Sequence, residues 1–218
     1  MIDLHTHSLY SDGELIPAEL WRRAQVMGYR YLAITDHVDA SNFEEVFRRL
    51  KVAADSLNHG EPPYLIPGLE FTHIPPAHIG DLVKQARDLG VPLIIVHGET
   101  LAEPVAPGTN LEALKADIDI LAHPGLISHE EAALAKTRGV FLEISARSGH
   151  CLANGHVVKV AREAGAALLL NTDAHAPGDL ITRQQAERIA RGAGLTYSEV
   201  HDLFVSAEAL ARRLAGGG

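Results

Sequence analysis

The feature that most constrains the fold is a series of apolar runs that each end in a histidine or a carboxylate. Seven runs occur, and they are followed by His5 and His7, Asp36 and His37, Glu70, His97, His123, Glu143, and Asp173 and His175. Continuous apolar runs of this length are typical of parallel strands buried on both faces. Because parallel strands point the same way, their carboxyl ends meet at one rim. The sequence therefore predicts imidazole and carboxylate groups gathered at one end of a sheet.

The segments between these runs have helical character. The predicted strands cover 2–4, 31–35, 64–69, 91–96, 118–122, 140–142 and 167–172. The predicted helices cover 17–27, 41–57, 75–89, 128–137, 155–164, 182–191 and 198–214. Two helices begin with a capping-box pattern, Ser41 with Glu44 and Ser128 with Glu131. The alternation of strand and helix predicts an α/β fold, a closed barrel of seven (β/α) units with its chemistry at the carboxyl ends of the strands.

Length and composition narrow the class of protein. A chain of 218 residues suits one domain, expected over 1–215, with 216–218 as a flexible tail. The net charge of −9 argues against a broad basic groove, so nucleic acid is not an expected partner. No apolar stretch approaches the ~20 residues that span a bilayer. The N-terminus lacks a signal core and the chain has a single cysteine, Cys151, so a cytoplasmic location is expected.

The residue types at the rim favour metal ions. His5 and His7 are separated by one residue, and the two-residue period of a strand directs both imidazoles to one face. Asp173 and His175 repeat this spacing. Imidazole combined with carboxylate suits zinc, iron or manganese, whereas the lack of thiolate disfavours a structural zinc site. A carboxylate such as Glu70 can bridge two ions about 3.5–4 Å apart.

Six motifs together resemble the PHP (polymerase and histidinol phosphatase) superfamily. They are HTHSLYSDG at 5–13, ITDH at 34–37, GLE at 68–70, His97, LAHPG at 121–125 and NTDAH at 171–175. The resemblance runs from residue 5 to residue 175. It implies a distorted seven-stranded (β/α)7 barrel, in agreement with the number of apolar runs.

The resemblance also implies a centre of two to three divalent ions, Zn, Mn or Fe. Glu70 would bridge the first and second ions, and some relatives carry histidine near the Asp12 position, which implies a weaker third site in this chain. Glu143 and Asp36 are expected to support ligands through hydrogen bonds. The implied ligands are His5, His7, Glu70 and Asp173 for the first ion, Glu70, His97 and His123 for the second, and Asp12, His37 and His175 for the third.

The loops beyond the strands suggest substrate contacts. Arg147 follows Glu143 and is the best candidate for a phosphate contact, because guanidinium binds phosphate oxygens in a bidentate fork. His150 lies in the same loop, and Glu99 lies in the proline-containing loop 98–110. His73 could touch the substrate or support a ligand, and Arg183 is a weaker phosphate candidate.

The predicted function is that of a metal-dependent phosphoesterase. A metal-bridging hydroxide would attack the phosphorus of a small phosphomonoester, as in histidinol-phosphate phosphatases, with Glu70, Asp173, His175 and Arg147 as the catalytic set. The alternative is a phosphodiesterase or nuclease-type enzyme acting on a nucleotide or a cyclic phosphate. A third and less favoured hypothesis is a non-catalytic PHP domain. The sequence leaves the oligomeric state open.

Overall fold

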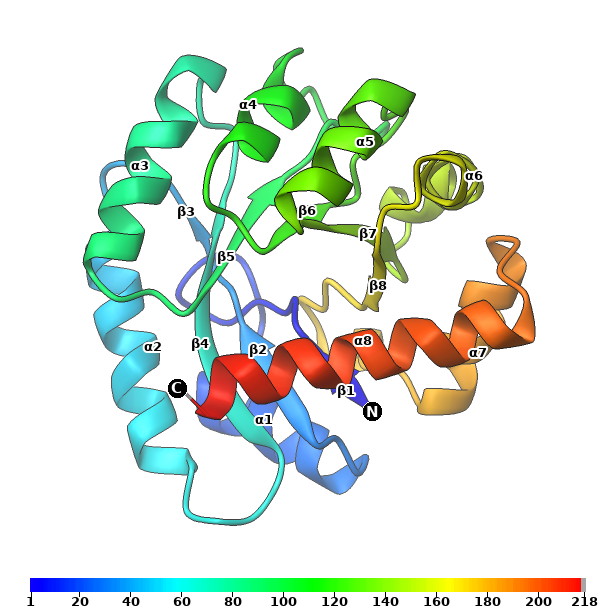
Figure 1. Cartoon of the computed structure of the whole chain (residues 1–218). Coiled ribbons are helices and arrows are strands. Elements are labelled where there is room, and N and C mark those ends of the chain that lie inside the picture. Colours follow the sequence, from blue (N-terminus) through cyan, green and yellow to red (C-terminus); the bar gives the residue numbers. More distant parts are fainter. Residues whose placement is uncertain (217–218) are drawn as a thin grey trace.

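A parallel sheet forms the centre of the protein in a computed structural model that describes residues 1–216 (Figure 1). The strand order is β1-β2-β4-β5-β6-β7-β8, with the short β3 paired to β4, and every pairing is parallel. The strands are β1 Ile2–Asp3, β2 Tyr31–Ile34, β3 His37–Val38, β4 Tyr64–Phe71, β5 Leu93–His97, β6 Ile120–Ala122, β7 Phe141–Ser145 and β8 Leu168–Asn171. The seven predicted runs all form strands, and β3 is an addition to them.

The two edges of the sheet, β1 and β8, approach each other and nearly close a barrel. Thr6 and Ala174 form a single parallel bridge just beyond the two strands. The backbone N–H of His7 donates to the carbonyl of Ala174 at 2.8 Å, and that of Asp173 donates to the carbonyl of His5 at 2.9 Å. The prediction of an α/β, barrel-like fold is therefore confirmed, and the closure lies beside residues predicted to bind metal.

Side chains reinforce this seam. Asp3 is fully buried and accepts hydrogen bonds from the hydroxyl of Thr172 at 2.6 Å and from its backbone N–H at 3.2 Å. Burial raises the pKa of the Asp3 carboxyl to about 6. Asn171 Oδ1 accepts a hydrogen bond from the backbone N–H of Leu4 at 2.9 Å. Between β1 and β8, the side chains of Asp3 and Asn171 thus accept backbone hydrogen bonds that carbonyl oxygens would accept in a regular pair of strands.

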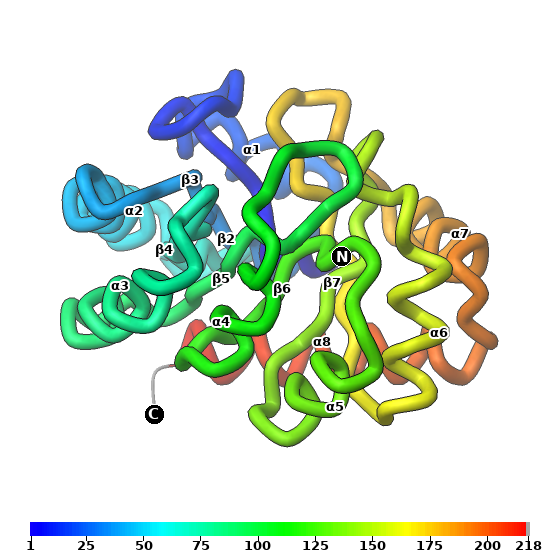
Figure 2. The backbone as a smooth tube through the Cα atoms, turned by 90° about the horizontal axis from the view of Figure 1, so that it is seen from above, coloured from blue at the N-terminus to red at the C-terminus, as the bar shows by residue number. Residues whose placement is uncertain are grey.

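Helices surround the sheet, as Figure 2 shows from above. They are α1 Pro17–Val26, α2 Phe43–Leu57, α3 Pro76–Asp88, α4 Thr109–Lys115, α5 His129–Arg138, α6 Asn154–Ala164, α7 Arg183–Gly192 and α8 Tyr197–Gly216, with 3-10 turns η1 His150–Ala153 and η2 Pro177–Asp179. The seven predicted helices are present, and α4 is an addition to them. Gly216, the first residue of the predicted tail, belongs to α8, and Gly217 and Gly218 lie outside the described residues.

The two predicted capping boxes have different outcomes. Ser128 accepts from the backbone N–H of Glu131, whose carboxylate accepts in return from the N–H of Ser128, as predicted. At the other site, α2 begins at Phe43 and its first turn has no side-chain cap. Ser41 instead donates from its hydroxyl and backbone N–H to Asp39, so the prediction for Ser41 and Glu44 is wrong. A nearby carboxylate competes successfully for the serine.

The barrel interior is apolar at the beginnings of the strands, where α8 packs across it (Figure 1). This interior cluster consists of Ile2, Leu4, Tyr31, Ala33, Ile66, Leu93, Ile95, Ile120, Ala122 and Leu169, together with Ala207, Leu210 and Ala211 of α8. A larger apolar cluster fills the space between the sheet and the surrounding helices. Over residues 1–216, no helix is both long and apolar enough to cross a membrane. Because the interior is apolar at the beginnings of the strands, the polar side chains inside the barrel lie at the carboxyl ends of the strands.

Candidate metal centre

The two-residue period of the strands carries the interior face into the predicted ligands. In β5, Leu93 and Ile95 point into the barrel, and His97 is the next residue in phase. In β8, Leu169 points inward, and Asp173 follows four residues later. The apolar layers thus give way to imidazole and carboxylate within one or two steps along each strand. This is why the sequence pattern alone located the rim.

Four predicted ligands of the first ion converge at the barrel axis. His5 Nε2 lies 3.3 Å from Glu70 Oε1, and His7 Nε2 lies 3.1 Å from Asp173 Oδ1. The other two imidazole–carboxylate separations are 3.7 Å from His5 Nε2 to Asp173 Oδ1 and 3.6 Å from His7 Nε2 to Glu70 Oε2. An ion with tetrahedral bonds of 2.0–2.1 Å separates its ligand atoms by about 3.3–3.4 Å. The spacing therefore fits donors arranged around one cation.

Four of these atoms lack hydrogen-bond partners. His5 Nε2, His7 Nε2, Glu70 Oε1 and Asp173 Oδ1 are buried and make no hydrogen bond, whereas Glu70 Oε2 lies 2.7 Å from His37 Nδ1 in an ion pair. Buried polar atoms without partners are costly, and a buried carboxylate more so. A divalent cation would satisfy all of them at once. The residues present therefore fit the metal that the resemblance implied.

The third predicted position lies at the edge of the cluster. Asp12 Oδ1 is 3.1 Å from His175 Nε2 and 3.6 Å from His37 Nε2, and the two imidazole nitrogens are 3.4 Å apart. Thr72 Oγ1 lies 2.6 Å from His37 Nδ1, which leaves Nε2 facing the other two donors. Asp12 is more than half exposed, at 58% of its side chain. This position is the most open of the three.

Asp36 holds the loop that carries Asp12. Its carboxylate accepts hydrogen bonds from the backbone N–H and the hydroxyl of Ser8 and from the hydroxyl of Ser11, each at 2.7 Å. Gly13 closes the same loop, and a Cβ at this position would lie 2.4 Å from the carbonyl oxygen of His7. Asp36 therefore supports a ligand through its loop, and Gly13 permits the close approach.

The second predicted position contains one more imidazole than expected. His97, His123 and His150 bring ring nitrogens within 4.8 Å of one another. His97 Nδ1 donates to the carbonyl of Gly98 at 3.2 Å, which leaves Nε2 facing the cluster. His123 Nε2 lies 3.8 Å from Glu70 Oε1, and the ring of His123 stacks on that of His150 at 4.1 Å. His150 was predicted as a substrate contact, and the structure places it among the imidazoles.

Glu143 orients the first histidine. Its Oε2 accepts from His5 Nδ1 at 2.9 Å and from Asn171 Nδ2 at 2.8 Å. Because Nδ1 is engaged, His5 presents Nε2 to the cluster. This contact agrees with the predicted supporting role of Glu143.

Burial and the neighbouring charges act against each other in the cluster, and the carboxylates raise the pKa of His5, His37 and His97 despite burial. Burial lowers the pKa of His7 and of His123 well below the usual value and raises the pKa of Asp173 to about 7. Burial alone would raise the pKa of Glu70, but the neighbouring His5 and His37 hold it well below its usual range. The neutral imidazoles keep a free electron pair for a metal ion.

Two ligands and one neighbour have strained backbones. His123, Asp173 and His73 have φ values of 28°, 53° and 53°, in the left-handed region that side chains seldom occupy. Each such residue costs of order 1–3 kcal/mol and persists only where the surroundings hold it. His123 directly follows β6, and His73 and Asp173 lie two residues beyond the ends of β4 and β8. The strain turns their side chains toward positions that a regular strand would not reach.

Arg147 lies at the rim beside the first and third positions. Its Nη1 donates to the carbonyl oxygen of Asp173 at 3.1 Å and lies 2.7 Å from His175 Nδ1, and its Nε is 3.8 Å from Asp173 Oδ2. The side chain is 30% exposed, so part of the guanidinium fork remains accessible. This placement is compatible with the predicted phosphate contact.

Two predicted substrate contacts have other roles. The carboxylate of Glu99 accepts from the backbone N–H groups of Gly108 and Asn110, so it braces its own loop. Arg183 lies on α7, where it pairs with Glu187 and covers the ring of Phe204. Local partners therefore engage both side chains, and the structure does not bring either of them together with the clustered histidines and carboxylates.

One residue at the rim was not predicted from the sequence. Glu103, in the loop after β5, lies 3.3 Å from His97 Nε2, 3.3 Å from His73 Nε2 and 3.4 Å from His150 Nε2. Its only sequence clue is an acid six residues after a predicted ligand, in a proline-containing loop. His73 therefore belongs to the edge of the cluster through Glu103.

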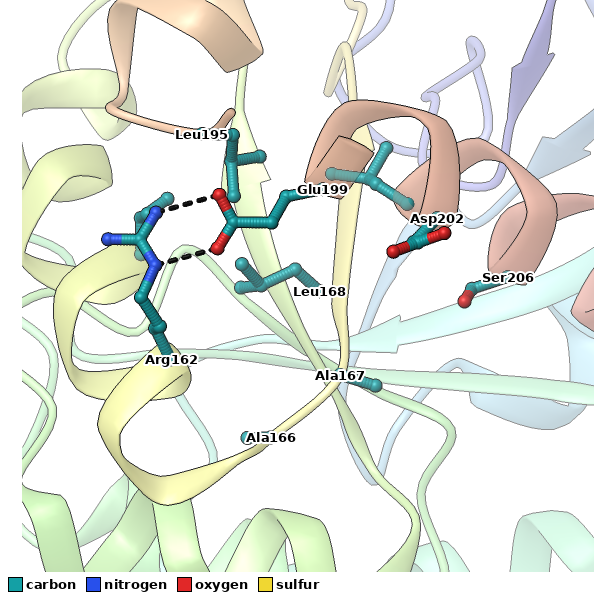
Figure 3. A pocket seen from close by; sticks show the side chains of 10 residues that line it. Arg162, Ala166, Ala167, Leu168, Leu195, Glu199, Asp202 and Ser206 are labelled. Carbon is teal, nitrogen blue, oxygen red and sulfur yellow. Dashed lines mark hydrogen bonds and ion pairs between the residues drawn. The ribbon is translucent and has the colours of Figure 1, made fainter. Parts of the chain in front are cut away.

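A separate cavity of about 180 Å³ lies away from this centre, between α6, the beginning of β8 and α8 (Figure 3). Arg162 and Glu199 face each other across it in a bidentate pair with distances of 2.6 and 3.0 Å. This pair joins α6 to α8 at the apolar end of the barrel. The chemistry of the molecule is concentrated at the opposite end.

Comparison with known proteins agrees with this arrangement. The sequence matches the family described as PHP domain over residues 3–138. The chain belongs to the PHP domain family. An uncharacterized protein of Methanocaldococcus jannaschii is 48% identical to this PHP protein over 205 residues, which cover 93% of the chain and 94% of that protein.

Two further proteins that are similar to this chain carry functional names. The DNA polymerase/3'-5' exonuclease PolX of Bacillus subtilis is 29% identical over 196 residues, covering 79% of this PHP protein and 34% of PolX. The histidinol phosphate phosphatase of Lactococcus lactis, solved with zinc, L-histidinol and phosphate, superimposes with a TM-score of 0.59 at 17% identity, covering 89% of this chain and 94% of that one. At that identity the superposition shows a shared fold.

Proposed function

We propose that this protein is a metal-dependent phosphomonoesterase that acts on a small phosphorylated substrate. The observation that carries the proposal is the group of buried donor atoms without partners at the axis, on His5, His7, Glu70 and Asp173. Two further groups of possible ligands adjoin it. Two to three ions held there, Zn, Mn or Fe, would lower the pKa of a bound water and supply a nucleophile at neutral pH.

The side chains of the rim would provide the remaining functions. Arg147 would hold phosphate oxygens, because its guanidinium lies between the first and third positions and is partly accessible. Glu143 would keep His5 in the tautomer that presents Nε2. Asp173 would hold the first ion and His175 the third. Glu70 would bridge the first and second ions and so fix the distance between them.

One cavity near the edge of the rim would suit a small substrate. It has a volume of about 600 Å³ and lies between the loop after β3, the loop after β4 and α3, with Thr72 and His73 in its wall and none of the predicted metal ligands. Asp39 and Asp81 also line it, so it favours an alcohol part without negative charge. The L-histidinol in the Lactococcus lactis structure is one example of such an alcohol. The location of the protein in the cytoplasm remains part of this proposal.

A second candidate is a phosphodiesterase acting on a nucleotide or a cyclic phosphate. It is favoured by the 29% identity to the polymerase and exonuclease PolX. The net charge of −9 provides little attraction for a long nucleic acid, which favours the monoester.

The test compares p-nitrophenyl phosphate with bis-p-nitrophenyl phosphate, using protein loaded with Mn, Zn or Fe and analysed for metal content. The proposal expects monoester cleavage, and His123→Ala should lose one ion and nearly all turnover while the circular dichroism spectrum persists. Preferential cleavage of the diester would favour the second candidate. Full activity of His123→Ala would contradict the assignment of the centre.

A further inference from the structure

Two rim loops each place one additional side chain beside His97 and His123. Glu103 comes from the loop between β5 and α4, and His150 comes from η1 after β7. Neither residue belongs to the ligand set that the family motifs imply. Both are nevertheless as close to His97 or to each other as the implied ligands are to one another.

The distances around Glu103 are informative. Its Oε2 lies 3.3 Å from His97 Nε2, and its Oε1 lies 3.4 Å from His150 Nε2. Charged N–H···O hydrogen bonds are shorter, about 2.7–2.9 Å. The edge of a tetrahedron around an ion with bonds of 2.0–2.1 Å is about 3.3–3.4 Å. The separations therefore match donors that share an ion better than they match direct hydrogen bonds.

His150 is built into the same position. Its side chain is 5% exposed, and Thr100 Oγ1 lies 2.8 Å from Nδ1, so Nε2 is the atom left for the cluster. Its ring stacks on His123 at 4.1 Å and meets His97 edge-on at 5.7 Å. A neutral imidazole with a fixed tautomer is the form that binds metal.

We propose that His150 and Glu103 are ligands of the second ion, in addition to Glu70, His97 and His123. The inference rests on the metal centre of the proposed function. It assigns five protein donors to this position, two of them from separate loops. The ion would then connect the loop after β5 to the turn after β7.

Zinc binding to the full chain tests the proposal directly. Protein stripped of metal is titrated with Zn²⁺ in competition with a chromogenic chelator, and the bound zinc is counted by elemental analysis. His150→Gln and Glu103→Gln should each weaken one ion of the set by at least about tenfold and leave the others unchanged. Glu130→Gln and His201→Gln, at exposed positions on α5 and α8, are the matched controls.

Glu103→Asp separates ligation from charge. The shorter side chain keeps the charge but withdraws the oxygens, so the proposal expects the same loss of affinity as in Glu103→Gln. Full affinity in Glu103→Asp would show that Glu103 acts through charge alone and would overturn its assignment as a ligand. Since Glu103 lies on a half-exposed loop, its substitution leaves the barrel intact, which circular dichroism verifies.

The remaining outcomes distinguish this inference from the proposed function. Wild-type protein that binds no zinc would refute the metal centre itself. Wild-type protein that binds zinc, with unchanged affinity in both His150→Gln and Glu103→Gln, would refute only the two added ligands. Unchanged zinc affinity combined with a raised KM in His150→Gln would identify His150 as the substrate contact that the sequence suggested.

Discussion

At the scale of single residues, the candidate metal centre depends on close approaches between backbone segments as well as on its imidazole and carboxylate side chains. A Cβ on Gly98 would lie 2.3 Å from the carbonyl oxygen of Ala122, and one on Gly125 would lie 1.9 Å from that of Glu99. These glycines lie next to His97 and just after His123. They allow the loops after β5 and β6 to approach, and so bring two ligands to one position.

Gly13→Ala should empty the third position selectively. The added Cβ would meet the backbone of His7 and Ser8 at 2.4 and 2.8 Å, so the loop must shift and carry Asp12 away. We expect one fewer ion per chain by elemental analysis. Gly80→Ala is the control, because a Cβ there has no neighbour within 4 Å. An unchanged metal content in Gly13→Ala would mean that Asp12 contributes no binding.

Arg147→Ala should mainly weaken substrate binding. Loss of a charged hydrogen-bonding group costs about 1.5–3 kcal/mol, equivalent to a rise in KM of roughly 10–150-fold. Steady-state kinetics on the best monoester measures this effect. Arg183→Ala should leave KM unchanged, because Arg183 is engaged by Glu187 and Phe204. Equal kinetics for Arg147→Ala and wild type would remove Arg147 from the substrate site.

Eight of the nine implied ligands were predictable because they follow an apolar run, and Asp12 was implied by the family motif alone. Glu103 was predicted by neither route. Its contacts with His73, His97 and His150 join three loops that are far apart in the sequence. The engagement of Glu99 and Arg183 by local partners also depends on loop geometry. A pattern of residue types identifies the strand ends but does not specify the path of the chain beyond them.

At the scale of elements, the seam between β8 and β1 combines closure of the barrel with placement of the ligands. Asp3 joins β1 to Thr172, and Asn171 joins β8 to Leu4. Both pairs immediately precede predicted metal ligands in the chain, His5 and Asp173. The stability of the seam and the position of His5 and Asp173 are consequently linked.

Asp3→Ala should destabilise the protein by about 2–4 kcal/mol, because it leaves a buried hydroxyl and a buried N–H without an acceptor. Urea unfolding of metal-free protein measures the free-energy difference. Asp202→Ala, at an exposed position on α8, should change the unfolding free energy by less than about 0.5 kcal/mol. A cost for Asp3→Ala no larger than this would show that the seam does not depend on Asp3.

The elements that the sequence missed are short. β3 has two residues, and its pairing with β4 arises only once His37 is placed beside Glu70. α4 has seven residues and begins after Gly108, inside a segment rich in proline. Periodicity needs a longer run to be recognised. The seven longer helices and the seven apolar strands carried enough residues to be predicted from pattern alone.

At the scale of the whole molecule, buried imidazoles and carboxylates are gathered at the carboxyl end of the barrel. Seven of the nine implied ligands keep less than 15% of their side chains exposed: His5, His7, Glu70, His97, His123, Asp173 and His175. Bringing them together without a cation is costly. The fold of the metal-free protein must therefore draw its stability from the apolar end.

Removal of metal should lower the thermal midpoint of unfolding. An ion present at one hundred times its Kd stabilises the folded state by about 2.7 kcal/mol. Differential scanning calorimetry with and without a chelator measures the shift, and added Zn²⁺ should restore it. His123→Ala should show a smaller shift than His129→Ala, whose side chain is exposed on α5. No shift in wild type would be inconsistent with ions held by buried groups.

Because α8 packs against the beginnings of the strands, the two ends of the barrel should differ in how many substitutions they tolerate. Leu210 and Ala211 pack on the interior cluster at one end, while every ligand lies at the other. Changes to the rim loops leave that packing intact, so a new alcohol-binding pocket can arise without loss of the core. Divergence among relatives should accordingly concentrate in the loops after β4, β5 and β7, with α8 and its partners varying only in apolar volume.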